Sequence, residues 1–433
     1  MSHVYQSDAK FLPPQQNPLL TRLIQSIFYI VVYFVYRIRI VVDDRDVAKL
    51  KAIADQRVVY LPNHSTLDDG LVVFLLSARL GQLFHYVVAY EAFQGLVGKL
   101  MQTVGAYSIR RGVGDRQSIM QTLKILQQPQ CKLVIFPEGG CSYQNDTVMP
   151  FRSGAVELSF KALKKLYQHE SKIPDFYLVP VSLKYQYPDA TDDQIDRALS
   201  RLEVALALKT TEDDLYLRLR AISARVLTNI ETEYHLTPVV EADWNQRIRF
   251  LRKHLLNYCE EKLQIVPVTE YPDRERVYKI QSVLAAIPES AKQGEIDYEH
   301  IYQTTVRLLN FDAIYDGYVA AKPTPERFFA TLDRLEREVF QIDRPKFKGQ
   351  RRVVVKIGTP INLKEYWSDY QSDSLWRWAE PNRGAWTESN RFANHQDNRN
   401  CVQQLDQRPI IDTITQALQQ EVQVSLIDNN TYH

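Results

Sequence analysis

Five short runs of apolar and β-branched residues constrain the fold of this 433-residue chain most strongly. They are RVVYLP (57–62), HYVVAY (85–90), GAYSIRR (105–111), KLVIFP (132–137) and FYLVPVSLKY (176–185). Such runs predict strands, and helical patterns lie between them, including residues 115–127 and 154–167. Because strands and helices alternate, we expect an α/β domain whose mostly parallel mixed sheet is covered by helices.

The pattern changes after Pro188, where long amphipathic segments predict helices. These segments are residues 192–208, 212–234, 241–264, 272–286 and 325–340. A further β-branched run, RRVVVKIG (351–358), follows them, and the helical segments offer this strand no partner. We therefore favour an insertion, in which the chain leaves the sheet, builds a helical unit and returns. In that case Val353–Val355 pair with a strand within residues 57–185, whereas the alternative is two sequential domains.

The predicted domain organisation is therefore discontinuous. It consists of an N-terminal tail with a membrane-anchoring apolar segment (1–45), the α/β domain (46–190 plus 351–367), the helical insertion (191–350), and a polar loop with a C-terminal helix (368–433).

The apolar segment Leu23–Tyr36 reads LIQSIFYIVVYFVY, in which only Gln25 and Ser26 are polar, and arginines flank it. As a helix it would be about 21 Å long at ~1.5 Å per residue, which is shorter than the ~30 Å hydrocarbon core of a bilayer. We favour a monotopic or peripheral anchor whose flanking arginines reach the headgroups. A span that recruits Leu19 and Leu20, or a buried core helix or strand, are the alternatives.

Net charge and cysteine content limit the ligands that the chain is expected to bind and the compartment in which it is expected to lie. The formal net charge is +1, so no global basic field favours nucleic-acid binding. The four cysteines form no C-x-x-C pair, which argues against structural zinc and a disulfide framework. They are Cys131, Cys141, Cys259 and Cys401. Reduced thiols favour a location on the cytoplasmic face of a membrane.

The motif PNHSTLDDG (62–70) follows the first predicted strand directly. His64 and Asp69 would lie about 140° apart on one continuous helix. They can meet only if His64 lies in the strand-to-helix turn and Asp69 in the first helical turn. A carboxylate on one ring nitrogen would fix the tautomer, so that the other nitrogen can take a proton from a hydroxyl. The alternatives are a helix cap, for which the spacing is also suitable, and a metal site that includes Asn63 and Asp68.

Two further strand ends carry groups suited to a phosphate or a hydroxyl. Arg110 and Arg111 end one strand, and guanidinium groups bind phosphate bidentately. Glu138 and Gly139 follow another strand in VIFPEGGCSY (134–143), where glycine lets the backbone approach a ligand. Considered singly, a solvated, charged strand end and an ordinary glycine turn with a solvated Glu explain these motifs better than a binding site does.

In their order and spacing, these blocks resemble the four sequence blocks of the glycerophospholipid acyltransferase family, which includes lysophosphatidate and glycerol-3-phosphate acyltransferases. The block NHxxxxD is matched by Asn63, His64 and Asp69. The arginine that the family uses for phosphate binding falls on Arg111, FPEG falls on residues 136–139, and the proline of the fourth, apolar block falls on Pro180.

The resemblance implies transfer of a fatty acyl group from acyl-CoA or an acyl-carrier protein to a glycerol hydroxyl. His64 would be the general base and Asp69 would orient it. Arg111, with Arg110 nearby, would hold the acceptor phosphate, and Glu138 and Gly139 would position the glycerol. The resemblance implies no metal and no bound cofactor, and membrane lipids would be the partners.

The third block departs from the family, because Gly140, Cys141 and Ser142 stand where Thr-Arg-Ser often follows FPEG. Arg110 or Arg152 could compensate for the missing arginine, and the identity of the acceptor is not predicted. This departure keeps one alternative open, a non-catalytic lipid-binding or scaffold protein on the same fold. A metal-dependent hydrolase that uses His64 and the paired aspartates is a third possibility.

Overall fold

The computed structural model describes most of the chain. The described residues are 10–209, 211–237, 243–269, 271–288, 290, 296–311, 315–375 and 409–427. Most of the polar loop expected between residues 368 and 400 lies outside them, although Trp367–Leu375 form helix α14.

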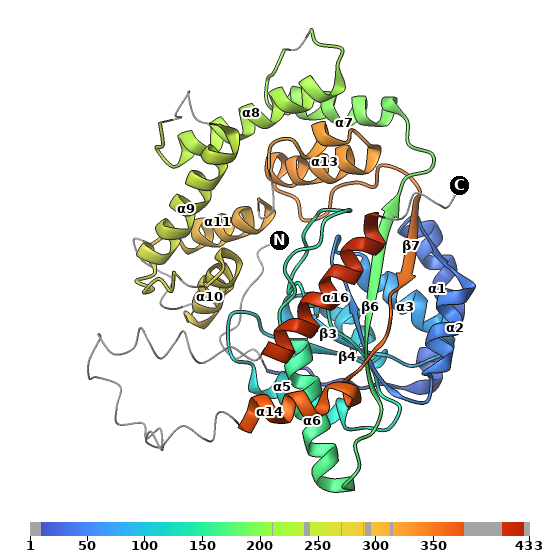
Figure 1. Ribbon diagram of the computed structural model, residues 1–433. Helices are drawn as coiled ribbons and strands as arrows, with labels where there is room; N and C mark the ends of the chain where they lie inside the picture. Colours follow the sequence, from blue (N-terminus) through green and yellow to red (C-terminus); the bar gives the residue numbers. More distant parts are fainter. Residues whose placement is uncertain are drawn as a thin grey trace.

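The core is an eight-stranded sheet with the order β1-β7-β6-β2-β5-β3-β4, and β8 pairs with β6 (Figure 1). The strands are β1 (Ile38–Val42), β2 (Arg57–Pro62), β3 (His85–Ala89), β4 (Ala106–Ile109), β5 (Lys132–Val134), β6 (Phe176–Gln186), β7 (Arg351–Ile357) and β8 (Ile361–Asn362). From β6 to β4 all neighbours are parallel, whereas β7 and β8 run antiparallel to β6. The predicted α/β fold with a mostly parallel mixed sheet is therefore confirmed.

Helices bury both faces of the sheet, which explains why its strands read as continuous apolar runs. One face packs against α1 (Pro18–Val35), α2 (Asp44–Ala52) and α3 (Asp69–Leu80). The other face packs against α5 (Arg116–Leu126), α6 (Gly154–Glu170), α14 and α16 (Pro409–Ile427). Successive residues of β2 alternate between the two cores, with Val58 in the first and Val59 in the second.

The residues after β6 build a helical unit with a hydrophobic core of its own. Its helices are α7 (Asp192–Ala205), α8 (Leu215–Glu233), α9 (Trp244–Lys262), α10 (Asp273–Ala286), α11 (Tyr298–Asn310), α12 (Tyr318–Ala321) and α13 (Pro325–Phe340). Leu199, Leu255 and Leu332, from three of these helices, are fully buried in that core. The unit lies beyond the C-terminal end of β6 (Figure 1).

The chain returns from the helical unit to the strand that it left. Val353 pairs with Tyr185 and Val355 with Leu183, which confirms the expected pairing of the return strand. Gln186 and Arg352 are also paired, so the two ends of the unit lie side by side on neighbouring strands. An insertion at this point leaves the sheet intact, although the division into folding domains stays a prediction.

The N-terminal edge of the sheet was not anticipated. We had assigned residues 38–42 to the anchoring segment, but they form β1 and pair in parallel with β7, with Ile40 opposite Val353. β7 therefore joins the N-terminal segment to the rest of the sheet.

Helix α1 buries the polar Thr21 and Gln25 together with Val32, and it leaves most of its other apolar side chains exposed. The buried Gln25 amide donates to Ser77 Oγ of α3 and to the Gln82 carbonyl, both at 2.9 Å. Leu19 and Phe34 on the outer face are 85% and 73% exposed. The segment is therefore not a buried core element, which was one of the three interpretations.

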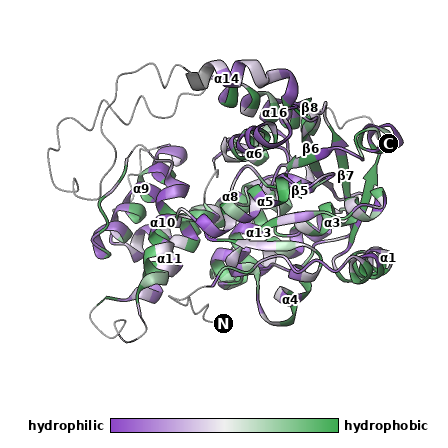
Figure 2. Ribbon diagram, turned by 90° about the horizontal axis from the view of Figure 1, so that it is seen from below, coloured by the Kyte–Doolittle hydropathy of each residue, from purple (hydrophilic) through white to green (hydrophobic). Residues whose placement is uncertain are grey.

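By length and composition, α1 is the one helix among the described residues that could cross a membrane. It lies on the side of the molecule away from α9 and α11 (Figure 1 and Figure 2).

Candidate active site

The C-terminal edge of the parallel strands gathers three of the four blocks. The first block follows β2, the second ends β4 and the third follows β5. β2 and β5 are neighbours, but β4 lies two strands beyond β5. At ~4.8 Å per strand, the end of β4 is therefore about 14 Å from that of β2, so only long side chains can bridge the gap.

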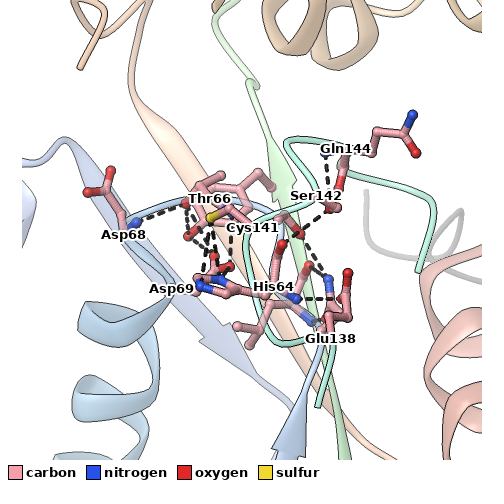
Figure 3. A network of polar contacts seen from close by, with 12 residues as sticks. His64, Thr66, Asp68, Asp69, Glu138, Cys141, Ser142 and Gln144 are labelled. Carbon is pink, nitrogen blue, oxygen red and sulfur yellow. Dashed lines mark hydrogen bonds and ion pairs between the residues drawn. The ribbon is translucent and has the colours of Figure 1, made fainter. Parts of the chain in front are cut away.

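His64 and Asp69 meet across the turn between β2 and α3. His64 Nδ1 lies 2.9 Å from Asp69 Oδ2 (Figure 3). His64 lies in the turn and Asp69 is the first residue of α3, which is the arrangement that their contact requires. Asp68, which the capping and metal interpretations involve, makes no side-chain cap. It pairs instead with Arg351 at 2.8 Å and Arg344 at 3.1 Å.

The carboxylate of Asp69 is fully buried and surrounded by hydrogen-bond donors. Thr66 donates to it from its main-chain N at 2.9 Å and from Oγ1 at 3.2 Å, and the Tyr185 hydroxyl donates at 2.7 Å. Because an ionised carboxylate only accepts hydrogen bonds, the remaining contact requires His64 Nδ1 to carry a proton. In the neutral ring, Nε2 is then the nitrogen that can accept a proton.

Asn63 fixes the turn in front of His64. Its side-chain Oδ1 accepts from Leu183 N at 2.7 Å, and its Nδ2 donates to the Leu183 carbonyl at 3.1 Å. The amide thereby extends the pairing of β2 with β6 by one residue. A residue with both an acceptor and donors is needed at this position.

The third block holds the backbone of His64. Glu138 Oε1 accepts from His64 N at 2.7 Å and Oε2 accepts from Met149 N at 3.2 Å, while Ser142 N donates to the His64 carbonyl at 2.8 Å. Glu138 is only 2% exposed. We expected it to hold a substrate hydroxyl, but in the structure both of its oxygens bind main-chain N–H groups. Burial raises the pKa of Glu138 to about 8, although these hydrogen bonds oppose the rise.

Cys141 lies directly against the imidazole. Its Sγ is 3.6 Å from His64 Nδ1 and 3.7 Å from Nε2. The nearly equal distances mean that the sulfur does not lie along the lone pair of Nε2. Desolvation and the negative charge of Asp69 raise the pKa of the thiol well above its ordinary value. The geometry and the charge therefore favour a neutral thiol that packs against the ring.

The two strand-end arginines diverge. Arg110 turns back to Asp115, which accepts from its main-chain N at 2.9 Å and lies 3.6 Å from its Nε. Arg111 points toward the helical unit, where its Nη1 donates to the Tyr278 hydroxyl at 3.0 Å. Its Nη2 lies 3.5 Å from Glu91 Oε2. Arg111 is thus the arginine that faces the third block.

Gly139 adopts a positive φ of 70°, and Arg152 covers it. A Cβ at this position would lie 2.3 Å from the Arg152 guanidinium carbon, so the close approach needs glycine. Tyr278 donates to the Gly139 carbonyl at 3.2 Å. The third-block loop is therefore in contact with Arg152 and with Tyr278 of the helical unit.

Several residues of the site were missed from the sequence. Tyr185 carried a usable signal, because it lies two residues past Leu183 on the strand that pairs with β2. Tyr278 carried none, since it is 167 residues from Arg111 in the chain. Among the described residues, no three His, Cys, Asp or Glu side chains are grouped so as to hold a metal ion.

Comparison with known families identifies the matched part of the chain. The family model Acyltransferase matches residues 40–184, which run from β1 to β6 and contain all four blocks. No curated protein matches the chain. The helical unit and β7 lie outside the matched range. The match to this family model therefore supports acyl transfer as the class of reaction.

Replacement of Cys141 tests whether its thiol takes part in the chemistry. Cys141→Ala should retain kcat within roughly threefold, because a protonated thiol beside the base is not an activated nucleophile. Acyl transfer is measured at saturating substrates, with Cys259→Ala as the control for loss of a buried thiol. A loss as large as that caused by removing His64 would contradict this prediction and show that turnover needs the Cys141 side chain.

The raised pKa of Glu138 predicts a pH-dependent stability. A raised folded-state pKa gives stability that is present below the ordinary value near 4.5 and is lost as pH rises through about 8. Relative to Glu138→Gln, the wild-type free energy of unfolding should therefore fall over that range. Urea denaturation at pH 5, 6.5 and 8 measures it, with Glu261→Gln on exposed α9 as control. A constant difference between wild type and Glu138→Gln would contradict the prediction.

Proposed function

We propose, from the match of residues 40–184 to the Acyltransferase family model, that the chain transfers a fatty acyl group from a thioester to a hydroxyl of a glycerophosphate-type acceptor. Lysophosphatidate or a similar lysophospholipid is the acceptor class that we favour. Such a reaction belongs to phospholipid biosynthesis or remodelling.

The observation that supports this proposal best is the 2.9 Å contact between His64 Nδ1 and the buried Asp69 carboxylate. With Nδ1 protonated, Nε2 takes the proton of the acceptor hydroxyl as its oxygen attacks the thioester carbonyl. The tetrahedral intermediate collapses, the C–S bond breaks, and the imidazolium returns the proton to the departing thiolate. Asp69 stabilises the imidazolium between the two steps.

Arg111 is the group that we propose for the acceptor phosphate. It donates to the Tyr278 hydroxyl, which in turn donates to the Gly139 carbonyl of the third-block loop. Arg152 covers Gly139 and suits the role of the arginine that the third block lacks. Two guanidinium groups around one backbone segment would fit a phosphate, which accepts several charge-assisted hydrogen bonds.

The acyl donor would be acyl-CoA or an acyl-carrier protein, used as a co-substrate and not as a resident cofactor. The proposed mechanism requires that the acceptor hydroxyl lie within hydrogen-bond reach of His64 Nε2 and that the thioester carbonyl lie beside that hydroxyl. Glu138 would act behind His64 as a positioning residue, because both of its oxygens bind main-chain N–H groups.

We further propose that α1 anchors the protein to the cytoplasmic face of a membrane. The helix packs polar Gln25 against α3 and exposes Leu19, Ile30 and Phe34, which is the reverse of a water-facing helix. Leu96 and Val97 of α4 (Gly95–Thr103) are also exposed. Asn17, before α1, donates to the Thr103 carbonyl at 3.0 Å. An apolar surface on adjoining helices suits an interfacial anchor.

The catalytic proposal predicts that His64→Ala abolishes acyl transfer while the protein stays folded. Asp69→Asn should lower kcat by roughly 10²–10⁴-fold, because the tautomer of His64 is no longer fixed. His169→Ala, at an exposed position near the end of α6, is the matched control. Turnover is measured with a labelled acyl thioester and a panel of phosphorylated acceptors. Turnover of His64→Ala at the wild-type rate would refute the mechanism.

The membrane proposal predicts that charge on the outer face of α1 releases the protein. Ile27→Glu combined with Phe34→Glu should shift the protein from the membrane fraction to the soluble fraction, since both side chains are exposed. Leu217→Glu with Phe250→Glu, exposed on the helical unit, is the control for added negative charge. If the α1 variant still sediments with vesicles, another surface anchors the chain.

A further inference from the structure

Helix α10 of the helical unit contacts both arginines that flank the third-block loop. Tyr278 accepts from Arg111 Nη1 at 3.0 Å, and the Arg111 guanidinium carbon lies 4.4 Å from the centre of its ring. Glu275, three residues earlier and so on the same side of the helix, pairs with Arg152 Nη1 at 2.6 Å. A single helix face thus engages both guanidinium groups.

The α/β domain is shaped to receive this helix. A Cβ on Gly112 would lie 2.2 Å from the Tyr278 carbonyl oxygen, and a Cβ on Gly140 would lie 2.3 Å from the Tyr278 hydroxyl. Two glycines of the domain therefore leave the space that α10 fills. Arg274 Nη2 also donates to the Cys141 carbonyl at 3.0 Å. The backbone contact at Gly112, which leaves no room for a Cβ, indicates a specific docking position for α10.

The Glu275 carboxylate and the Tyr278 hydroxyl bind the two guanidinium groups as a phosphate would, but with fewer oxygens and less negative charge. The Glu275 carboxylate offers Arg152 two acceptor oxygens and one negative charge, and the Tyr278 hydroxyl offers Arg111 one neutral oxygen. A phosphate monoester offers three oxygens and up to two charges, and it binds guanidinium forks bidentately. The Arg152–Glu275 pair is also partly exposed, with side chains 39% and 30% accessible, so an incoming anion can compete for it.

We propose that Glu275 and Tyr278 are specificity-determining residues that hold the guanidinium groups of Arg152 and Arg111 until the phosphate of the acceptor takes their place. This inference rests on the proposed function for the identity of the anion. α10 then sets a threshold for acceptor binding, because only a ligand that offers more charge than Glu275 displaces it. An uncharged glycerol or a neutral lipid would not meet that threshold.

The test uses the full-length protein and the variants Glu275→Gln and Tyr278→Phe. Glu275→Gln removes the competing charge, so KM for the phosphorylated acceptor should fall by roughly two- to fivefold, while KM for the acyl thioester stays constant. Tyr278→Phe keeps the ring on Arg111 and should lower the acceptor KM to a smaller extent. Arg152→Ala should raise it. Asp273→Asn is the matched control, because Asp273 lies on the same helix but pairs with Arg252 and Arg276.

Binding of inorganic phosphate, measured by titration calorimetry, gives a readout that does not depend on acyl transfer. Glu275→Gln should bind phosphate more tightly than both wild type and Asp273→Asn. If Glu275→Gln binds phosphate more tightly but no phosphorylated acceptor is acylated, competition between Glu275 and phosphate is supported and the proposed function is wrong. If Glu275→Gln leaves phosphate affinity and acceptor KM unchanged, or weakens both, α10 is only a structural brace and the inference is wrong.

Discussion

The contact between His64 and Asp69 depends on a buried carboxylate that three different elements hold in place. Asp69 begins α3, Thr66 lies in the turn after β2, and Tyr185 reaches it from the end of β6. A buried charge is costly unless donors surround it, and Thr66, Tyr185 and His64 provide the donors to Asp69. The parallel pairing of β2 with β6 brings the strand ends together, so the sheet and the base–carboxylate pair form one arrangement.

The third-block loop connects this pair to the helical unit. On one side Glu138 and Ser142 bind the backbone of His64. On the other side Arg334 of α13 donates to the Ser142 carbonyl and Arg274 of α10 donates to the Cys141 carbonyl. The inserted helices therefore contact the segment that binds the backbone of His64. Under the proposed function, this arrangement would let the helical unit influence acceptor binding directly, which a separate domain tethered by a linker could not do.

The sequence predicted the features that depend on local residue patterns and on the order of the four blocks. Runs of β-branched residues predicted β2 to β6, and the five-residue spacing required His64 to lie in a turn. The lack of a nearby partner for residues 351–358 predicted their pairing with the main sheet. β1 was missed because only Arg37 separates residues 38–42 from the apolar run of the anchor, so the two segments were assigned together. The contacts of Tyr278 and Arg274 were missed because they depend on how one face of α10 packs against residues more than 130 positions away, and no local periodicity records such packing.

Initial-velocity kinetics of the wild-type protein test direct transfer to a hydroxyl activated by His64. Acyl thioester and phosphorylated acceptor are varied together, and reciprocal rates are plotted against reciprocal acceptor concentration. Direct attack requires both substrates to be bound at once, so we expect lines that intersect. Parallel lines would indicate a covalent acyl-enzyme, and this result would contradict the role of His64 as the base that activates the acceptor hydroxyl.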